Sequence, residues 1–274
     1  MEKVKQFARQ HTLAYCILAE IVFLGFLTGC GFVIGRLAGD INYYVLLLIQ
    51  EALGAAFAWG ILAVSGLLPV LKNRGSGFGK GLICGIYLLV MGIYSIVVFL
   101  ALYEGERVLQ PWYLIAAYLA CMLCVGIAEE FLFRGVIATL FLRKFGTYHK
   151  DVPKAVVISG VLFGLAHVSN VMEGALVGVL VQTVIASMLG MLFAAIYFRT
   201  GCIWVTVFLH AFIDIAAGIT TGLYGNETLM DTVSSYSPVQ LVSCVPYLIV
   251  LLVLLRAKKI NEVDDNMGTL LSSI

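Results

Sequence analysis

Long apolar runs, repeated along the chain, constrain its fold more than any other feature of the sequence. Of the 274 residues, 61% are hydrophobic and only 12% are charged. Apolar runs of about 18 residues or more are typical of transmembrane helices. In lipid the backbone must satisfy its own hydrogen bonds, which leaves helix bundles and closed barrels. Without alternating segments of about ten residues, the pattern excludes a barrel and predicts an all-α, polytopic transmembrane helical bundle.

The apolar runs divide the chain into about eight expected spans. Lys and Arg gather in alternate connections, and only Arg36 and Arg107 fall on the other side, with Arg134 inside a span. Because basic residues favour the cytoplasmic side of a membrane, both termini are expected to be cytoplasmic. The expected spans are 12–35, 42–68, 82–103, 111–143, 154–170, 174–198, 202–222 and 238–256.

The chain is expected to have one central functional segment. Residues 1–110 are predicted to be N-terminal transmembrane helices that pack on a core at 111–222, and 223–274 to hold a last loop, a last span and a cytoplasmic tail. The tail after Lys259 is polar and is expected to be disordered. No basic tract is long enough to bind nucleic acid. Cys121 and Cys124 form a C-x-x-C pair on an apolar helix with no second pair, which indicates membrane packing.

Ionisable residues inside a span are costly and are therefore candidates for function. Glu129, Glu130 and Arg134 lie in the fourth expected span, in AEEFLFRG. His167 ends FGLAH in the fifth span, whereas HAFID in the seventh contains His210 and Asp214. Glu20 and Glu51 lie in the first two spans, and the sequence gives them no role.

Helical geometry separates the two adjacent glutamates. Glu130 and Arg134 are four residues apart with the acid first, the favourable order for an ion pair. Glu129 points about 100° away and lacks that partner. At about 1.5 Å per residue, Glu129, His167 and His210 lie about 17–21 Å from the basic ends of their helices. Three side chains from three helices are therefore expected to meet at one depth.

A carboxylate beside neutral imidazoles suits the activation of water. Glu129 would act as general base, and a histidine would share the water or stabilise the oxyanion of a tetrahedral intermediate. The Glu130–Arg134 pair would then fix the helix so that Glu129 faces the cavity.

These motifs, on three spans and in one order, resemble the CAAX protease and bacteriocin-processing (CPBP or Abi) family, which includes the type II prenyl-protein endopeptidases. The resemblance covers about residues 111–222 and rests on Glu129, Glu130 and Arg134, then Phe163 and His167, then His210 and Asp214. It implies hydrolysis of a peptide bond within the membrane. It also implies that the first glutamate and first histidine activate water, while the second histidine and the residue at 214 support the oxyanion.

The chain departs from that pattern at one position. Asp214 stands where prenyl-protein members of the family have Asn, and an ionised Asp cannot donate a hydrogen bond to an oxyanion. Asp214 could instead orient His210, and its presence favours a bacterial type of enzyme in the plasma membrane. We expect no cofactor. The alternative is a divalent metal such as zinc on Glu129, His167 and His210, although the helical zinc motif H-E-x-x-H is absent.

The expected partners are the lipid bilayer and a peptide or membrane-protein substrate, with or without a lipid anchor, and no nucleic acid. Two other functions remain open. The same carboxylates and histidines could relay protons in a transporter, although the sequence lacks inverted repeats. The scaffold could also be an inactive immunity or binding protein, an alternative that Asp214 keeps open.

Overall fold

The computed structural model of the protein contains helices joined by short loops, and no strand, among the residues that it describes, which are 2–37, 39, 41–225 and 228–274. The predicted all-α fold is therefore confirmed. The helices are α1 (Glu2–Gln10), α2 (Thr12–Leu37), α3 (Tyr43–Ser65), η1 (Leu68–Leu71), α4 (Phe78–Cys84), α5 (Ile86–Leu102), α6 (Trp112–Glu130), η2 (Phe131–Ala138), α7 (Thr139–Phe145), α8 (Val152–Ala166), η3 (His167–Met172), α9 (Leu176–Thr200), α10 (Ile203–Ala217), α11 (Ile219–Tyr224), α12 (Leu229–Ser234), η4 (Pro238–Ser243), α13 (Cys244–Leu254) and α14 (Ala257–Ser273).

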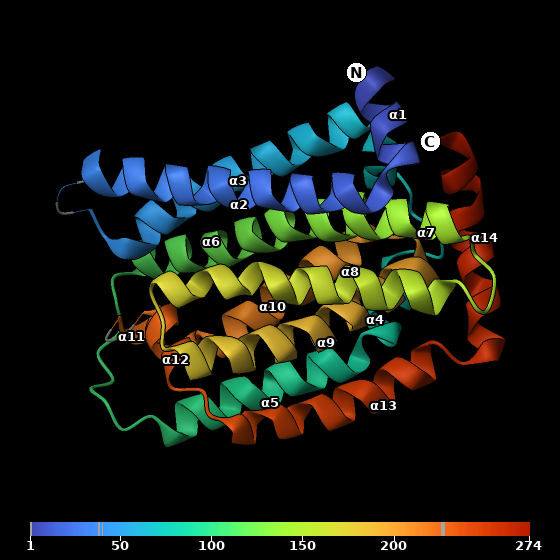
Figure 1. Cartoon of the computed structure of the whole chain (residues 1–274). Coiled ribbons are helices and arrows are strands. Elements are labelled where there is room, and N and C mark those ends of the chain that lie inside the picture. Colours follow the sequence, from blue (N-terminus) through green and yellow to red (C-terminus); the bar gives the residue numbers. More distant parts are fainter. Residues whose placement is uncertain (1, 38, 40, 226–227) are drawn as a thin grey trace.

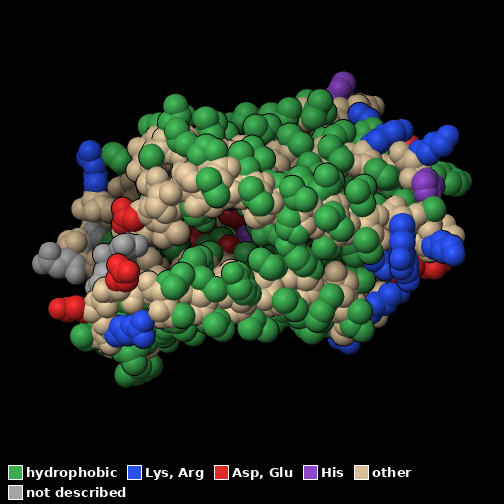
Figure 2. All heavy atoms as spheres, turned by 90° about the horizontal axis from the view of Figure 1, so that it is seen from below, with side chains coloured by type: hydrophobic (Ala, Val, Ile, Leu, Met, Phe, Trp, Pro, Cys, Tyr) green, Lys and Arg blue, Asp and Glu red, His purple; other side chains and the backbone are tan. Residues whose placement is uncertain are grey.

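The long helices lie side by side around α6, which is near the middle of the bundle (Figure 1). Helix α6 packs along α3 and α10, and α8 packs along α9. Apolar side chains cover much of the face shown in Figure 2, whereas Lys and Arg gather towards one end. This distribution suits a bundle surrounded by lipid, with its polar ends in water.

Five helices among the described residues are long and apolar enough to cross a membrane, and two bent pairs raise the number to seven. Helices α4 and α5 meet at 68°, and the segment ending with α13 meets α14 at 70°. Helix α10 is apolar but only 15 residues long. The protein is thus an integral membrane protein, and the expected number of eight spans remains a prediction.

The span expected at 111–143 runs from Trp112 to Phe145, and its helix changes its winding in the middle. Residues Phe131–Ala138 form a π-helix between α6 and α7. The Thr139 hydroxyl donates to the carbonyl oxygen of Arg134, five residues earlier, at 2.8 Å. Stretches of π-helix are frequent at functional sites, and this one begins directly after Glu130.

The expectation of a disordered tail is wrong, because residues 257–273 form α14. Ile260, Val263, Met267 and Leu270 recur at helical spacing and are buried on one face of this helix. Helix α14 packs across the end of α9, while Arg9 of α1 donates to the carbonyl oxygen of Ile274 at 2.6 Å. The N-terminal helix and the C-terminus therefore share the basic end of the bundle (Figure 1). The side of the membrane on which that end lies remains a prediction.

Candidate active site

Glu130 and Arg134 form the ion pair that their spacing predicts. Arg134 Nε lies 3.0 Å from Glu130 Oε2, and both side chains are almost completely buried. The contact is electrostatic, since the Arg134 nitrogens make no hydrogen bond of good geometry within the described part of the chain. The guanidinium instead lies over two aromatic rings, 4.4 Å from the centroid of Phe163 and 5.0 Å from that of Phe193. These cation–π contacts hold the charge in place.

His210 connects α10 to the same glutamate. Its Nδ1 lies 2.8 Å from Glu130 Oε1. The carboxylate that pairs with Arg134 can only accept a hydrogen bond, so the Nδ1–H of His210 must donate to it. The imidazole also stacks on Phe193, with ring centroids 5.1 Å apart. These two contacts fix the ring and direct its Nε2 away from Glu130.

The Nε2 atom of His210 faces two further carboxylates. Glu129 Oε2 lies 3.7 Å from it and Asp214 Oδ2 lies 3.4 Å from it. The side chains of Glu129 and Asp214 are 23% and 29% exposed, whereas that of Glu130 is completely buried. Glu129 and Asp214 therefore line an accessible space. Figure 2 shows a hollow in the apolar side of the bundle, with acidic and histidine side chains visible inside it.

His167 lies beside this group of side chains without bonding to it among the described residues. Its Nδ1 contacts the carbonyl oxygen of Phe163 at 2.9 Å, where α8 gives way to η3. The Phe163 ring contacts both imidazoles, with its centroid 5.2 Å from that of His167 and 5.6 Å from that of His210. Phe163 thus separates and positions the two histidines.

The structure brings most of the predicted site residues together. Glu129, Glu130, Arg134, His210 and Asp214 form one connected group, and Phe163 links this group to His167. The spacing in the sequence predicts a contact of Glu130 with Arg134 alone and gives no sign of its contact with His210. Phe193 was not predicted either, because an aromatic residue in an apolar span resembles any other core residue.

Glu51 is a further acidic residue near the site, on α3. It is 8% exposed and lies within electrostatic range of Glu129 and Asp214. Glu20 of α2 is buried to a similar extent, at 7%. Its Oε2 has no hydrogen-bond partner in the described part of the chain. The place of both residues in apolar spans marks them in the sequence, but it could not show that Glu51 lies within electrostatic range of the site residues.

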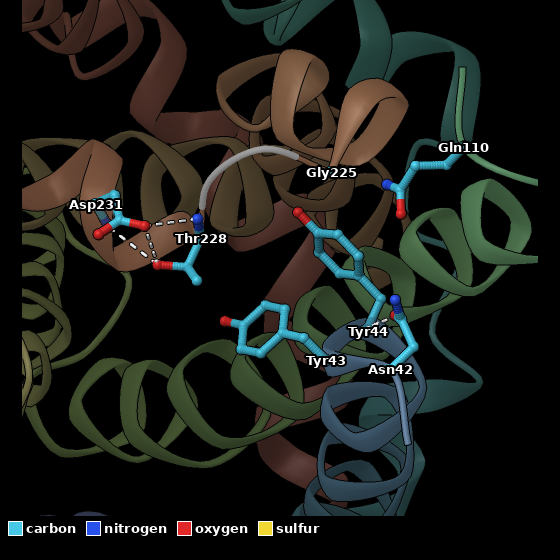
Figure 3. A pocket seen from close by; sticks show the side chains of 7 residues that line it. All are labelled: Asn42, Tyr43, Tyr44, Gln110, Gly225, Thr228 and Asp231. Atoms are coloured by element: carbon cyan, nitrogen blue, oxygen red, sulfur yellow. Dashed lines mark hydrogen bonds between the residues drawn. The ribbon is translucent and has the colours of Figure 1, made fainter. Parts of the chain in front are cut away.

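A separate polar pocket lies where α3 begins (Figure 3), at the end of the bundle opposite α1 and α14 (Figure 1). The backbone N–H of Thr228 donates to Asp231 at 2.7 Å and lowers the pKa of that carboxyl, which therefore serves as a helix cap. Gln110 is occupied as well, since its amide donates to the carbonyl oxygens of Thr221 and Gly222. The polar groups of this pocket hold loops together, so we do not place the active site there.

The donor groups do not gather into a metal site. Within the described ranges, no three His, Cys, Asp or Glu side chains are placed so that they could hold a metal ion. Glu129 and His210 are close together, but His167 does not complete a set of three with them. The expectation that the protein uses no cofactor stays a prediction.

Residues 111–216 match the family model of type II CAAX prenyl endopeptidases, Rce1-like. Comparison with curated proteins gives no significant match. The match confirms the resemblance that the motifs predict and includes the site residues from Glu129 to Asp214. At the level of the family, it supports an intramembrane endopeptidase of the CAAX type.

Proposed function

We propose that the protein hydrolyses a peptide bond of a membrane-associated protein or peptide, using a water molecule activated by Glu129. The observation that carries this proposal is the unequal pairing of two adjacent glutamates. Glu130 contacts both Arg134 and His210 Nδ1, whereas Glu129 is partly exposed and lies 3.7 Å from the remaining nitrogen of His210. Glu129 is therefore the carboxylate that is free to exchange a proton with water.

The reaction begins when Glu129 takes a proton from water bound in the hollow. The resulting hydroxide attacks the carbonyl carbon of the substrate and forms a tetrahedral intermediate with a negatively charged oxygen. Glu129 then gives the proton to the amide nitrogen, and the C–N bond breaks to release a carboxylic acid and an amine. The acid proton passes to the amine, so the products leave as a carboxylate and an ammonium ion. General acid–base catalysis of this kind contributes about 10²–10⁴-fold to the rate.

The histidines and Asp214 would position the water and the developing charge. His210 Nε2 faces the space beside Glu129 and, when protonated, can donate a hydrogen bond to the oxyanion. Asp214, 3.4 Å from the same nitrogen, keeps His210 oriented. His167, on the other side of Phe163, would share the water. Glu130, Arg134 and Phe163 act through these groups and are positioning residues.

We propose a mechanism without a metal or other cofactor, because the donor set does not gather around one point. The substrate reaches the site from the membrane, since the hollow opens on the apolar side of the bundle (Figure 2). A peptide precursor, a membrane protein or a lipid-anchored protein would fit this access. The family pattern with Asp at 214 favours a bacterial plasma membrane.

The test is cleavage of a quenched-fluorescence peptide library by the full chain purified in detergent. We expect Glu129→Gln to lower kcat at least about 100-fold while the melting temperature stays close to that of the wild type. Glu20→Gln is the control, because Glu20 is a glutamate of another apolar helix, α2, and is buried at 7% exposure. This control variant should keep its activity.

Each assay is repeated with a chelator. Activity that survives the chelator supports the glutamate mechanism, whereas activity lost to the chelator and restored by added zinc would contradict it. Full activity in Glu129→Gln would overturn the role of Glu129. Solute movement coupled to pH, without cleavage by the wild type, would favour the transporter instead.

A further inference from the structure

A groove lies at the basic end of the bundle, between the loop that follows η1 and the start of α10. Its volume is about 560 Å³, and its lining includes Lys72, Arg74, Phe78 and Trp204. Binding sites for small molecules commonly measure about 300–1,000 Å³. The groove is thus large enough for a ligand, and it combines positive charge with aromatic surface.

The two basic residues of the groove differ from their neighbours in having no acidic partner. Lys80, Arg199 and Lys259 all contact Glu262, at 3.5, 2.8 and 2.7 Å. Lys72 and Arg74 are exposed and form no ion pair with a described residue. Two unneutralised positive charges therefore face the groove.

The loop that carries Lys72 and Arg74 is fastened to the rest of the protein. The Asn73 side chain donates to the carbonyl oxygen of Asn266 at 3.1 Å, and the Ser76 N–H donates to that of Thr200 at 2.9 Å. Gly75 has a φ of +44° and lies so close to the Thr200 carbonyl that a Cβ atom would clash with it. The backbone that carries the two charges is therefore held in place before any ligand binds, which lowers the entropic cost of binding.

Aromatic side chains continue from the groove along the outer side of α10. Trp204 and Phe208 are 41% and 42% exposed and lie one helical turn apart. The Trp204 indole N–H donates to the carbonyl oxygen of Leu71 at 3.0 Å, which fixes the ring at the wall of the groove. Phe208 contacts Phe78 at a centroid distance of 5.7 Å and stacks on Phe212 at 6.2 Å. An apolar surface thus leads from the basic rim towards the middle of the span.

We propose that the groove binds one anionic phospholipid of the surrounding bilayer. The phosphate would lie between Lys72 and Arg74, and an acyl chain would follow Trp204 and Phe208. Charge complementarity favours an anionic lipid, because a zwitterionic headgroup would not neutralise two unpaired basic residues, and anionic headgroups attract basic residues at a membrane surface. The aromatic surface favours a lipid over a free anion. This site is independent of the proposed proteolytic activity.

Quenching of Trp204 fluorescence tests the proposal on the full chain. The chain has three tryptophans. Trp59 and Trp112, 50% and 80% exposed, are replaced by Phe so that only Trp204 remains. The protein is reconstituted into phosphatidylcholine vesicles that contain a small fraction of brominated phosphatidylglycerol or, separately, of brominated phosphatidylcholine. We expect the anionic lipid to quench Trp204 at a much lower fraction.

Two double variants in this background separate the groove from general charge attraction. Lys72→Ala/Arg74→Ala should weaken the preference for phosphatidylglycerol about 30-fold, which corresponds to about 2 kcal/mol for the two charges. Lys150→Ala/Lys258→Ala removes two exposed basic residues elsewhere and should keep the preference. Circular dichroism establishes that both variants are folded.

Three results would overturn the proposal. Equal loss of preference in both double variants would mean that the basic end attracts anionic lipid without a site. An unchanged preference in Lys72→Ala/Arg74→Ala would exclude these residues as the headgroup contacts. Relief of quenching by millimolar inorganic phosphate or glycerol phosphate would show that the groove recognises a free anion.

Discussion

Two carboxylates of this protein, Glu130 and Glu262, each contact basic side chains from more than one helix, with opposite consequences. Glu262 on α14 contacts Arg199, Lys259 and Lys80, so the charge in excess there is positive and lies at the surface. Glu130 contacts Arg134 and His210, but Glu129 and Asp214 lie beside the same histidine. The charge in excess there is negative and lies inside the bundle.

The contrast shows which cluster can carry chemistry. Water and salt screen the excess positive charge around Glu262. We therefore expect the Glu262 cluster only to fasten α14 to the bundle. The excess negative charge around Glu130 lies in a poorly screened interior. An unpaired carboxylate there is costly, which makes it a candidate for a functional role. Substitutions in the two clusters should therefore differ in effect. The expected losses of stability and activity are larger for the interior cluster than for the surface cluster.

The largest effect is expected from removing Glu130. Glu130→Ala would leave Arg134 as a buried and uncompensated cation, which typically destabilises a protein by about 3–5 kcal/mol. Thermal unfolding in detergent measures this loss. The double variant Glu130→Gln/Arg134→Met, which removes both charges, should regain most of the stability. If the double variant were as unstable as the single one, the ion pair would not be the source of the effect.

The interior cluster was largely predictable because membrane spans make charge conspicuous. Glu129, Arg134 and His210 stand out in apolar runs, and the four-residue spacing of Glu130 and Arg134 requires no tertiary information. The contact between Glu130 and His210 was not predictable, because it depends on how α6 and α10 rotate against each other. The same applies to the stacking of Phe193 on His210.

The rest of the fold was less predictable where a local pattern depends on its neighbours. The bend of 68° between α4 and α5 interrupts a run that reads as one span. The polar tail was misjudged because the apolar residues of α14 are few, and they gain stability only by packing across the end of α9. The four apolar positions from Ile260 to Leu270 were the signal that could have revealed this helix.

A smaller effect is expected at Asp214, where the chain departs from the prenyl-protease pattern. Asp214→Ala removes the group 3.4 Å from His210 Nε2 and should lower kcat about 100-fold, since the imidazole loses its orientation. Asp214→Asn keeps the shape of the side chain and can donate a hydrogen bond, so its kcat should stay within about tenfold of the wild type. The measurement is steady-state cleavage of one peptide substrate. Equal losses in the two variants would mean that the charge of Asp214 is required.

The smallest effect is expected at the surface cluster, and it should depend on pH. Burial alone would raise the pKa of the Glu262 carboxyl, but hydrogen bonds from Lys259 and Arg199 and the charge of Lys80 lower it to about 2, from an ordinary value of 4.5. A carboxyl whose pKa is lowered by folding stabilises the folded state above its unfolded pKa. Glu262→Gln should therefore cost about 1 kcal/mol at pH 7. The difference from the wild type should shrink as the pH falls from 4.5 towards 2.

Hydrogen exchange of the α14 amides, compared at pH values above and below this range after correction for intrinsic rates, locates the effect of Glu262→Gln. The matched control is Asp265→Asn, because Asp265 is an exposed acid on the same helix that forms no ion pair with a described residue. Faster exchange confined to α14, with full proteolytic activity, would establish that this cluster only fastens the helix. A loss of activity in Glu262→Gln would instead couple the basic end to the site. The contrast with Glu130 would then fail, because both clusters would act on the same chemistry.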